Sequence, residues 1–526
     1  MNLRKKLLTF AIAAGLSSQA LAEDERTRIE TLHETTLNLI QLLVEQGVLK
    51  QDAADAMLAK AKQQAAEKVA QQKAAAAEAD KGVVRVTYVP ETVKREIREQ
   101  VRQEVVAQAK LERWGDVNAV PEWLDRLKWE GDMRLRYQAD LFSDSNAPEA
   151  VFQSVGQNIS NTLEDRQRER IRLRLGLNAN VSGKVDAGIR ITTGNSSDPV
   201  STNQTLGTYG NKFSLVLDRA FLKLRPVEDL SLWGGRMPNP FFSTDLVWDE
   251  DLNFDGLAAS YALGAQDPQR ELKPFVTAGI FPLQEIENNA GNRARDKWLY
   301  GAQAGLEWVP GTRARFKVGG AYYAYRNLTG IRNPFAPPAS YVPIYNDTGA
   351  KSRQKGNTQF NIRNDGNTDP TAGVWALASD YRLGNLTLVA DFANFYPVHI
   401  TGTLDWVRNF GFDRNRILAR TGQSIEPEID GYQARLTVGH PKFTWLENNE
   451  WQAYVGYRYL ERDAVLDAFT DSDFHLGGTN AKGFFIGGSY ALYKNTWLSA
   501  KWMSSDQISG LPLSIDVFQL DFNARF

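Results

Sequence analysis

Residues 168–192 read RERIRLRLGLNANVSGKVDAGIRIT, and this stretch decides the fold class. Apolar residues alternate strictly with charged, polar or glycine residues over 170–178, and they do so again over 185–192. Because the side chains of a β-strand point to opposite faces at every second residue, each run predicts a strand with one apolar and one polar face. The intervening Ser-Gly-Lys at 182–184 is typical of a tight turn. The stretch therefore predicts a hairpin that separates two solvents.

The same two-residue period recurs between residues 127 and 526. The predicted connections alternate between short turns and long loops, the longest of them at residues 327–372 and 397–429. An even number of strands with short turns at one rim and long loops at the other is typical of bacterial outer-membrane barrels. We therefore predict an all-β transmembrane barrel of 16 antiparallel strands. These predicted strands are residues 128–138, 168–180, 184–194, 213–225, 229–237, 254–264, 271–281, 298–308, 313–326, 373–383, 386–396, 430–440, 450–460, 483–493, 496–504 and 514–526.

The C-terminal strand adds a second indication of a membrane barrel. Apolar residues occupy every second position from Phe518 to the last residue, Phe526. A terminal Phe after such alternation resembles the C-terminal signal of outer-membrane barrels, which implies that the barrel-assembly machinery recognises Phe526. Aromatic residues also gather near the ends of the predicted strands, as the two interfacial girdles of such a barrel require.

The first 22 residues predict a secretory signal peptide. A positive segment at residues 4–6 precedes a short apolar run at 7–16, and the Ala-Leu-Ala at 20–22 supplies the small residues of a cleavage site. The apolar run is shorter than the roughly 20 residues that a membrane-spanning helix needs. We predict cleavage after Ala22 and export from the cytoplasm.

Residues 23–126 predict an α-helical periplasmic extension that precedes the barrel. Ile29, Leu32, Thr36, Leu39 and Leu43 follow the spacing of a heptad seam. Short isolated helices are marginal in water, so this stripe predicts a coiled-coil bundle of two or three chains. A loose, partly disordered arm is the alternative, because the Ala-rich sequence that follows packs weakly.

The composition excludes several classes of protein. The chain has 526 residues, a formal net charge of −2 and no cysteine. Without cysteine it has no disulfide scaffold, no thiolate metal site and no thiol nucleophile. A charge so close to neutral gives no reason to expect binding to nucleic acid.

Several motifs together resemble a known family. In chain order they are PEWLDR at 121–126, WEGDMRLRYQ at 129–138, the hairpin quoted above, GGRMPNPF at 234–241 and DLVWDEDLNFDG at 245–256. With the signal peptide and the helical extension, this order resembles the putative porin family of Gram-negative bacteria. The resemblance covers nearly the whole chain. It implies a passive channel in the cell outer membrane, in contact with lipid and lipopolysaccharide, and it favours a homotrimer.

The chemistry of the predicted lumen depends on two groups of charged residues. A barrel of sixteen strands is too wide for its own side chains to fill, so something must narrow it. We expect residues 238–255 to fold inward as an acidic constriction loop, opposite arginines on neighbouring strands. The acidic residues are Asp245, Asp249, Glu250, Asp251 and Asp255, and the basic residues are Arg134, Arg136, Arg170, Arg172, Arg174, Arg190 and Arg236. Opposed fixed charges of this kind set the selectivity of a pore.

Two alternatives concern this loop and its pore. The acidic loop could instead lie outside and bind divalent cations. Basic residues outnumber acidic ones on the lumen faces of the predicted strands, which favours anionic solutes, although the loop acids act against this preference. The function that we expect is passive diffusion of small hydrophilic solutes through a charged constriction. The alternative is a structural protein whose helical arm ties the outer membrane to the cell wall.

The sequence offers little support for an enzyme, a cofactor or a resident metal. The segment HETTL at His33 lacks the second histidine of a zinc-protease motif, and neither a nucleophile elbow nor a phosphate-binding loop is present. His475 lies near Asp471 and Asp473, an arrangement that is typical of solvated loop surface. Residues 364–367 (NDGN) form an incomplete Ca²⁺ loop.

Overall fold

The computed structural model describes residues 124–367, 369, 372–441 and 447–526. A short 3-10 helix, η2 (Leu124–Arg126), leads into the first strand. The predicted signal peptide and residues 23–123 of the predicted helical arm lie outside the described residues. The barrel strands are β1 (Leu127–Phe142), β2 (Arg166–Ser182), β3 (Val185–Thr193), β5 (Leu215–Leu224), β6 (Leu230–Pro238), β7 (Asn253–Ala262), β8 (Leu272–Gln284), β9 (Lys297–Trp308), β10 (Ala314–Arg326), β13 (Arg382–Phe395), β14 (Val398–Asn409), β15 (Asp430–Gly439), β16 (Trp451–Leu460), β17 (Ala481–Tyr493), β18 (Thr496–Gln507) and β19 (Ser514–Arg525).

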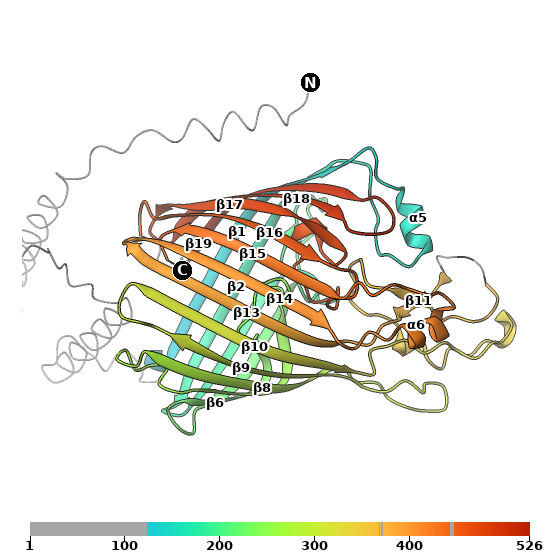
Figure 1. Ribbon diagram of the computed structural model, residues 1–526, viewed down its shortest axis with the longest axis horizontal. Coiled ribbons are helices and arrows are strands. Elements are labelled where there is room, and N and C mark those ends of the chain that lie inside the picture. Colours follow the sequence, from blue (N-terminus) through green and yellow to red (C-terminus); the bar gives the residue numbers. More distant parts are fainter. Residues whose placement is uncertain (1–123, 368, 370–371, 442–446) are drawn as a thin grey trace, which may run out of the picture. The chain divides into compact units, whose positions relative to one another are not determined.

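Within the described residues, these sixteen strands form one closed antiparallel barrel (Figure 1). Each strand pairs with the next along the chain, and β1 pairs with β19 to close the ring. A further strand of two residues, β4 (Gln204–Thr205), adds to the edge of β2. The prediction of a 16-stranded antiparallel barrel is confirmed. Closure matters physically because it leaves no unpaired strand edge inside a membrane.

The two faces of the strands have opposite chemistry. On β1, the side chain of Leu135 is 43% exposed on the outside, whereas that of Arg136, the next residue, is only 5% exposed. Leu217, Leu222 and Leu257 on other strands are likewise exposed. An apolar outside and a charged inside invert the arrangement of a water-soluble domain, and this inversion is what a lipid-facing barrel requires. Among the described residues, no helix is long and apolar enough to cross a membrane.

Turns of two to eleven residues join the strands at one rim of the barrel, and loops of twelve or more residues, apart from one of six, join them at the other. We call the loops L1 (143–165), L2 (194–214), L3 (239–252), L4 (285–296), L5 (327–381), L6 (410–429), L7 (461–480) and L8 (508–513). L1 contains helix α5 (Glu149–Ser154) and L6 contains helix α6 (Arg414–Thr421). L5 contains β11 (Gln359–Asn361) and β12 (Trp375–Leu377), which form a small separate sheet. Figure 1 shows β11 and α6 beyond the end of the barrel. The remaining 3-10 helices are η3 (Pro338–Ser340), η4 (Asn346–Thr348) and η6 (Phe474–Leu476).

One region of the strand prediction is wrong. The predicted strand 373–383 is mostly loop, since only Trp375–Leu377, in the small sheet of L5, and the last two residues, which begin β13, are extended. The missing barrel strand is β14, which falls in the predicted loop 397–429. Threonine and glycine weaken the apolar alternation of β14, whereas GVWALASDYRL at 373–383 imitates it. The two errors compensate, so the predicted number of strands is still correct.

The C-terminal residue completes the seam of the barrel. Backbone hydrogen bonds of 2.7 and 2.9 Å join Phe526 to Gly131 on β1. The ring of Phe526 occupies the space that a side chain at residue 131 would need, because a Cβ there would lie 2.3 Å from the ring. Glycine at residue 131 therefore leaves room for the ring of Phe526 to pack across the seam.

An apolar core lies inside the barrel, formed by lumen-facing residues and the loops that fold onto them. Phe241 and Trp248 of L3 each pack edge-to-face on Tyr323 of β10, with ring centroids 5.1 Å apart. Leu466 of L7 belongs to the same cluster. Within the long-loop half of the barrel, this core holds segments of L3 and L7 against the wall.

Candidate functional site: a charged cavity in the barrel lumen

Loop L3 begins and ends on neighbouring strands but contacts the opposite wall of the barrel. Thr244 donates a hydrogen bond of 2.5 Å to Asp405 on β14. Asp245 accepts hydrogen bonds from Gln433 on β15 and Arg458 on β16, both at 2.8 Å. Strand β16 lies eight strands from β6 around the sixteen-strand ring. The loop therefore crosses the lumen.

The bounds of this loop differ from the predicted segment 238–255. Pro238 is the last residue of β6, and Asp255 lies within β7. Asp255 pairs with Arg236 on the adjacent strand, 3.0 Å away, and does not belong to the inward loop. The acidic residues of L3 itself are Asp245, Asp249, Glu250 and Asp251.

L7 is a second inward loop, which the sequence analysis did not identify. The backbone N–H of Asp249 on L3 donates to the carbonyl of Phe469 on L7 at 2.8 Å, and that of Ser472 donates to the Asp249 carboxylate at 2.9 Å. Lys355 of L5 holds the far end of L7 by donating to the carbonyls of residues 475–477 at 2.5–3.0 Å. The available signal was the sequence AVLDAFTDSD at 464–473, which mixes apolar and acidic residues as L3 does.

Between L3, L7 and the wall lies a cavity of about 240 Å³, which we call the constriction cavity. Its basic side chains come from β1, β2, β15, β16 and β18, whereas most of its acidic side chains come from L3 and L7. The basic residues are Arg134, Arg136, Arg172, Arg435, Arg458 and Lys501, and the acidic residues are Asp245, Asp249, Glu250, Asp251, Asp471, Asp473 and Asp521. A solute in this cavity therefore lies between fixed charges of opposite sign.

Two arginines fix the loops to the wall by multiple ion pairs. Arg458 is 2% exposed and contacts Asp245 at 2.8 Å and Asp471 at 2.9 Å. Arg136 forms a two-pronged pair with Asp521 at 2.7 and 2.9 Å, and it also contacts Asp473 of L7 at 3.1 Å. Paired hydrogen bonds from one guanidinium to a carboxylate define geometry as well as energy. Both arginines thus hold the inward loops against the barrel wall, in addition to supplying positive charge to the cavity.

The loop acids respond differently to this setting. Burial disfavours ionisation of Asp245, but Arg458 and other cations outweigh burial and lower its pKa to about 2. Burial and the neighbouring Asp471 and Asp251 raise the pKa of Asp249 well above its usual value. Enclosure within the lumen, with Asp245 and Asp251 nearby, also raises the pKa of Glu250. Of these acids, Asp245 is thus held in its charged form, whereas the charged forms of Asp249 and Glu250 are disfavoured.

The structure places the predicted arginines in different surroundings. Arg134, Arg136 and Arg172 line the constriction cavity. Arg174 contacts Asp251 of L3 at 3.1 Å, so it also lies at this loop. Arg190 pairs with Asp218 of β5, within the wall. The others lie elsewhere: Arg170 lines a cavity between β2 and the loops L2, L5 and L7, and Arg236 lines the cavity described next.

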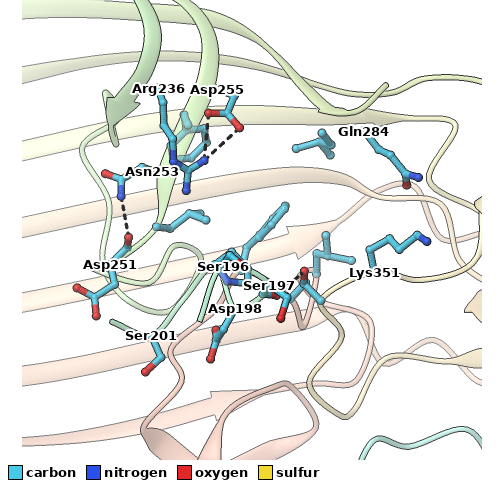
Figure 2. A pocket seen from close by; sticks show the side chains of 18 of the residues that line it. Ser196, Ser197, Asp198, Ser201, Arg236, Asp251, Asn253, Asp255, Gln284 and Lys351 are labelled. Atoms are coloured by element: carbon cyan, nitrogen blue, oxygen red, sulfur yellow. Dashed lines mark hydrogen bonds and ion pairs between the residues drawn. The ribbon is translucent and has the colours of Figure 1, made fainter. Parts of the chain in front are cut away.

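A larger cavity of about 630 Å³ lies on the other side of L3 (Figure 2). Figure 2 shows the Arg236–Asp255 pair on one side of it and the L2 residues Ser196, Ser197 and Asp198 on another. Many of its lining residues are apolar, including Trp248 of L3. L3 therefore has a cavity on each side, one strongly charged and one mixed.

His475 does not lie on solvated loop surface, which corrects the interpretation drawn from the sequence. The side chain is 1% exposed, its Nδ1 lies 2.9 Å from Ser505 Oγ, and burial lowers its pKa well below the usual value. The side chain thus packs between L7, to which it belongs, and β18. Among the described residues, no group of three or more histidine, aspartate or glutamate side chains is arranged to hold a metal ion.

Comparisons with known proteins give matches to solved structures and to one protein family. OmpF of Salmonella typhi in complex with daunomycin is 11% identical over 76% of this chain and 97% of that chain, with a TM-score of 0.40. The outer membrane channel DcaP of Acinetobacter baumannii is 12% identical over 76% and 97%, with a TM-score of 0.39. OprB of Pseudomonas putida is 11% identical over 77% and 96%, with a TM-score of 0.43. No curated protein matches the sequence. The model of the family described as Putative porin matches residues 33–526, and the chain therefore belongs to this porin family.

Proposed function

We propose that the protein is an outer-membrane channel for passive diffusion of small hydrophilic solutes, with L3 and L7 forming its constriction and a modest preference for anions. The observation that carries the proposal is the course of L3, which crosses the lumen and presents carboxylates opposite a wall of basic side chains. Charges fixed on opposite sides of a narrow aqueous passage favour polar solutes, because an apolar solute cannot replace the ordered water.

The anion preference rests on which charges remain unpaired. In the described part of the chain, no carboxylate lies in an ion pair with Arg435 or Lys501, although both line the constriction cavity. Arg435 stacks on the ring of Tyr454 instead, 3.9 Å from its centroid. Most of the acids, in contrast, lie in ion pairs with Arg136, Arg174 or Arg458. The two that do not, Asp249 and Glu250, have a raised pKa. The unpaired charge in the cavity is thus mainly positive.

Conductance in planar lipid bilayers tests this proposal. Under a salt gradient, we expect the full-length protein to form open channels whose reversal potential shows a preference for chloride over potassium. Arg172→Glu and Lys501→Glu should each move the reversal potential towards cation selectivity. The matched variant Arg414→Glu changes an exposed arginine of L6 that pairs with Glu426, and it should have little effect.

No channel activity from folded protein would refute the proposed function. An unchanged reversal potential in both cavity variants would instead remove these residues from the narrowest part of the passage. The two results are independent, because an unselective channel would still conduct.

The surroundings of the barrel follow from family membership. We propose that the short-turn rim faces the periplasm and the long-loop rim faces the outside, as in other outer-membrane barrels. Exposed aromatic side chains such as Phe395, Trp451 and Tyr493 lie near the short-turn rim, where an interfacial girdle is expected. We also propose a homotrimer, which crosslinking in native membranes would test. Crosslinking that gave monomers alone would contradict it.

A further inference from the structure

A third cavity lies where L2, L5 and L7 meet strand β2, and it is strongly basic. Its volume is about 410 Å³, and we call it the vestibule cavity. Four cationic side chains line it, Arg168, Arg170, Arg353 and Lys355, against a single carboxylate, that of Asp198. We propose that the vestibule cavity binds an oxyanionic group, a carboxylate or a phosphate, of solutes that enter the channel. This inference rests on the proposed channel function and names the class of solute.

Two of the guanidinium groups have only neutral partners. Arg170 donates to the side-chain oxygen of Gln138 at 3.3 Å. Arg353 donates to the carbonyl of Gly156 at 2.6 Å and to the side-chain oxygen of Gln359 at 2.8 Å. Neither has a carboxylate in ion-pair distance among the described residues. Their charge is therefore available to a ligand.

The vestibule cavity also contains donors that the protein leaves unused. The Nε–H groups of Arg168 and Arg170 are buried and have no hydrogen-bond acceptor in the structure. A buried donor without an acceptor is costly, so a ligand oxygen that reached either group after a small side-chain movement would gain a hydrogen bond that the protein does not provide. Arg168 forms an ion pair with Asp140 at 3.1 Å, which compensates its charge, but its Nε–H has no acceptor.

Arginine suits an oxyanion better than it suits chloride. The planar guanidinium presents parallel N–H groups that match two oxygens of a carboxylate or phosphate. Hydroxyl groups of Ser197, Ser201 and Ser472 line the same cavity and add further donors. Lys355 is already engaged with three carbonyls of L7, so it fixes the wall and adds charge.

The basic residues of β2 connect the vestibule cavity with the constriction cavity. Arg168, Arg170, Arg172 and Arg174 occupy alternate positions of one strand, so successive side chains stand roughly 7 Å apart along the same face. The first two line the vestibule cavity, Arg172 lines the constriction cavity and Arg174 contacts Asp251 of L3. An anionic group can therefore pass from one guanidinium to the next. A channel with such a site shows saturable binding of its solute.

Block of chloride current by added oxyanions tests the inference. Single channels of the full-length protein in potassium chloride are exposed to inorganic phosphate or to succinate from the long-loop side. We expect a reduction of the chloride current that saturates with either oxyanion concentration. The double variant Arg168→Gln, Arg170→Gln should raise the half-blocking concentration about tenfold or more, since it removes two charged donors. The ratio of the two half-blocking concentrations shows which oxyanion the cavity prefers.

Three controls make the result decisive. Arg414→Gln, an exposed arginine at the same rim, should leave the half-blocking concentration unchanged. Arg170→Lys keeps the charge but loses the planar fork, so its block should be intermediate. The electrophoretic shift of the folded barrel on heating shows that each variant is folded.

Two outcomes overturn the inference. One is the absence of block by either oxyanion in the wild type, and the other is equal block in the wild type and the double variant. Both leave the proposed function intact, because the channel would still conduct with its reversal potential set by the constriction cavity. If the wild-type protein does not conduct at all, the proposed function fails first.

Discussion

Replacing Arg458 by methionine should release L3 from the barrel wall. Arg458 is the shared partner of Asp245 and Asp471, and methionine preserves its volume without the charge. The pKa of Asp245 lies at about 2 instead of the usual 3.8 of an aspartate. This difference corresponds to about 2 kcal/mol of stabilisation of the docked loop, by the relation of about 1.4 kcal/mol per pKa unit. Arg458 is the largest of several groups that lower this pKa, so at neutral pH the variant should shift the equilibrium towards undocked L3 by up to about 30-fold.

The sign of the pH dependence follows from the lowered pKa. A carboxylate whose pKa is lowered stabilises the docked state above its ordinary pKa, and this contribution is lost as the pH falls towards 2. The difference between wild type and Arg458→Met should thus be full at pH 7 and should shrink in acid.

The assay uses the absence of cysteine from the natural chain. Ser243→Cys introduces a single thiol into L3, and its rate of modification by a charged maleimide reports how often the loop undocks. We expect a faster rate in the Arg458→Met background, together with larger fluctuations of the single-channel current. Arg414→Met, which breaks an exposed ion pair, is the control. Equal modification rates at pH 7 in the presence and absence of Arg458 would refute the reasoning.

The other predictions concern the seam, a buried acid and the anchor of L7. Gly131→Val should reduce the yield of folded barrel, because the new side chain meets the ring of Phe526, whereas Gly402→Val, with open space around it, should fold normally; equal heat-shift electrophoresis of both variants would contradict this. Asp467 is 1% exposed, and burial raises its pKa to about 7, so the folded state should lose up to about 4 kcal/mol of stability as the pH rises from 4 to 7. Asp467→Asn should remove this slope from thermal unfolding curves, and a slope that persists would exclude Asp467 as its cause. Lys355→Met removes three hydrogen bonds to L7, so limited proteolysis should cut this loop faster in the variant than in the wild type. An unchanged rate of cleavage would indicate that the apolar residues of L7 alone hold the loop.

The sequence is informative about the strands because the membrane imposes a strict pattern on them. Leu173 and Arg172 cannot exchange faces without placing charge in lipid, so their alternation predicts both fold and lumen side. The glycine at residue 131 could not be explained from the sequence, because the side chain that it makes room for, the ring of Phe526, lies almost 400 positions away. Where lumen residues are small or neutral, as in β14, the pattern fades and the prediction fails.

The candidate site was predictable only in part. The acids of L3 were recognisable because they cluster between two clear strands. We expected this loop to fold inward, and the contacts of Asp245 with the opposite wall agree with that expectation. L7 escaped notice because its docking depends on partners from L3 and L5, such as Lys355, that the sequence places more than a hundred residues away. The distribution of the arginines among the wall and three separate cavities depends on the same loops.

Reaction of single cysteines from the aqueous phase tests the central claim most directly. Arg134→Cys and Leu135→Cys place a thiol on adjacent residues of β1, one facing the constriction cavity and the other exposed on the outside of the barrel. In lipid vesicles, a small charged thiol reagent that cannot cross lipid should modify Arg134→Cys and leave Leu135→Cys unmodified. Modification of Leu135→Cys alone, or of both at equal rates in the folded protein, would contradict a wet lumen within a lipid-facing wall.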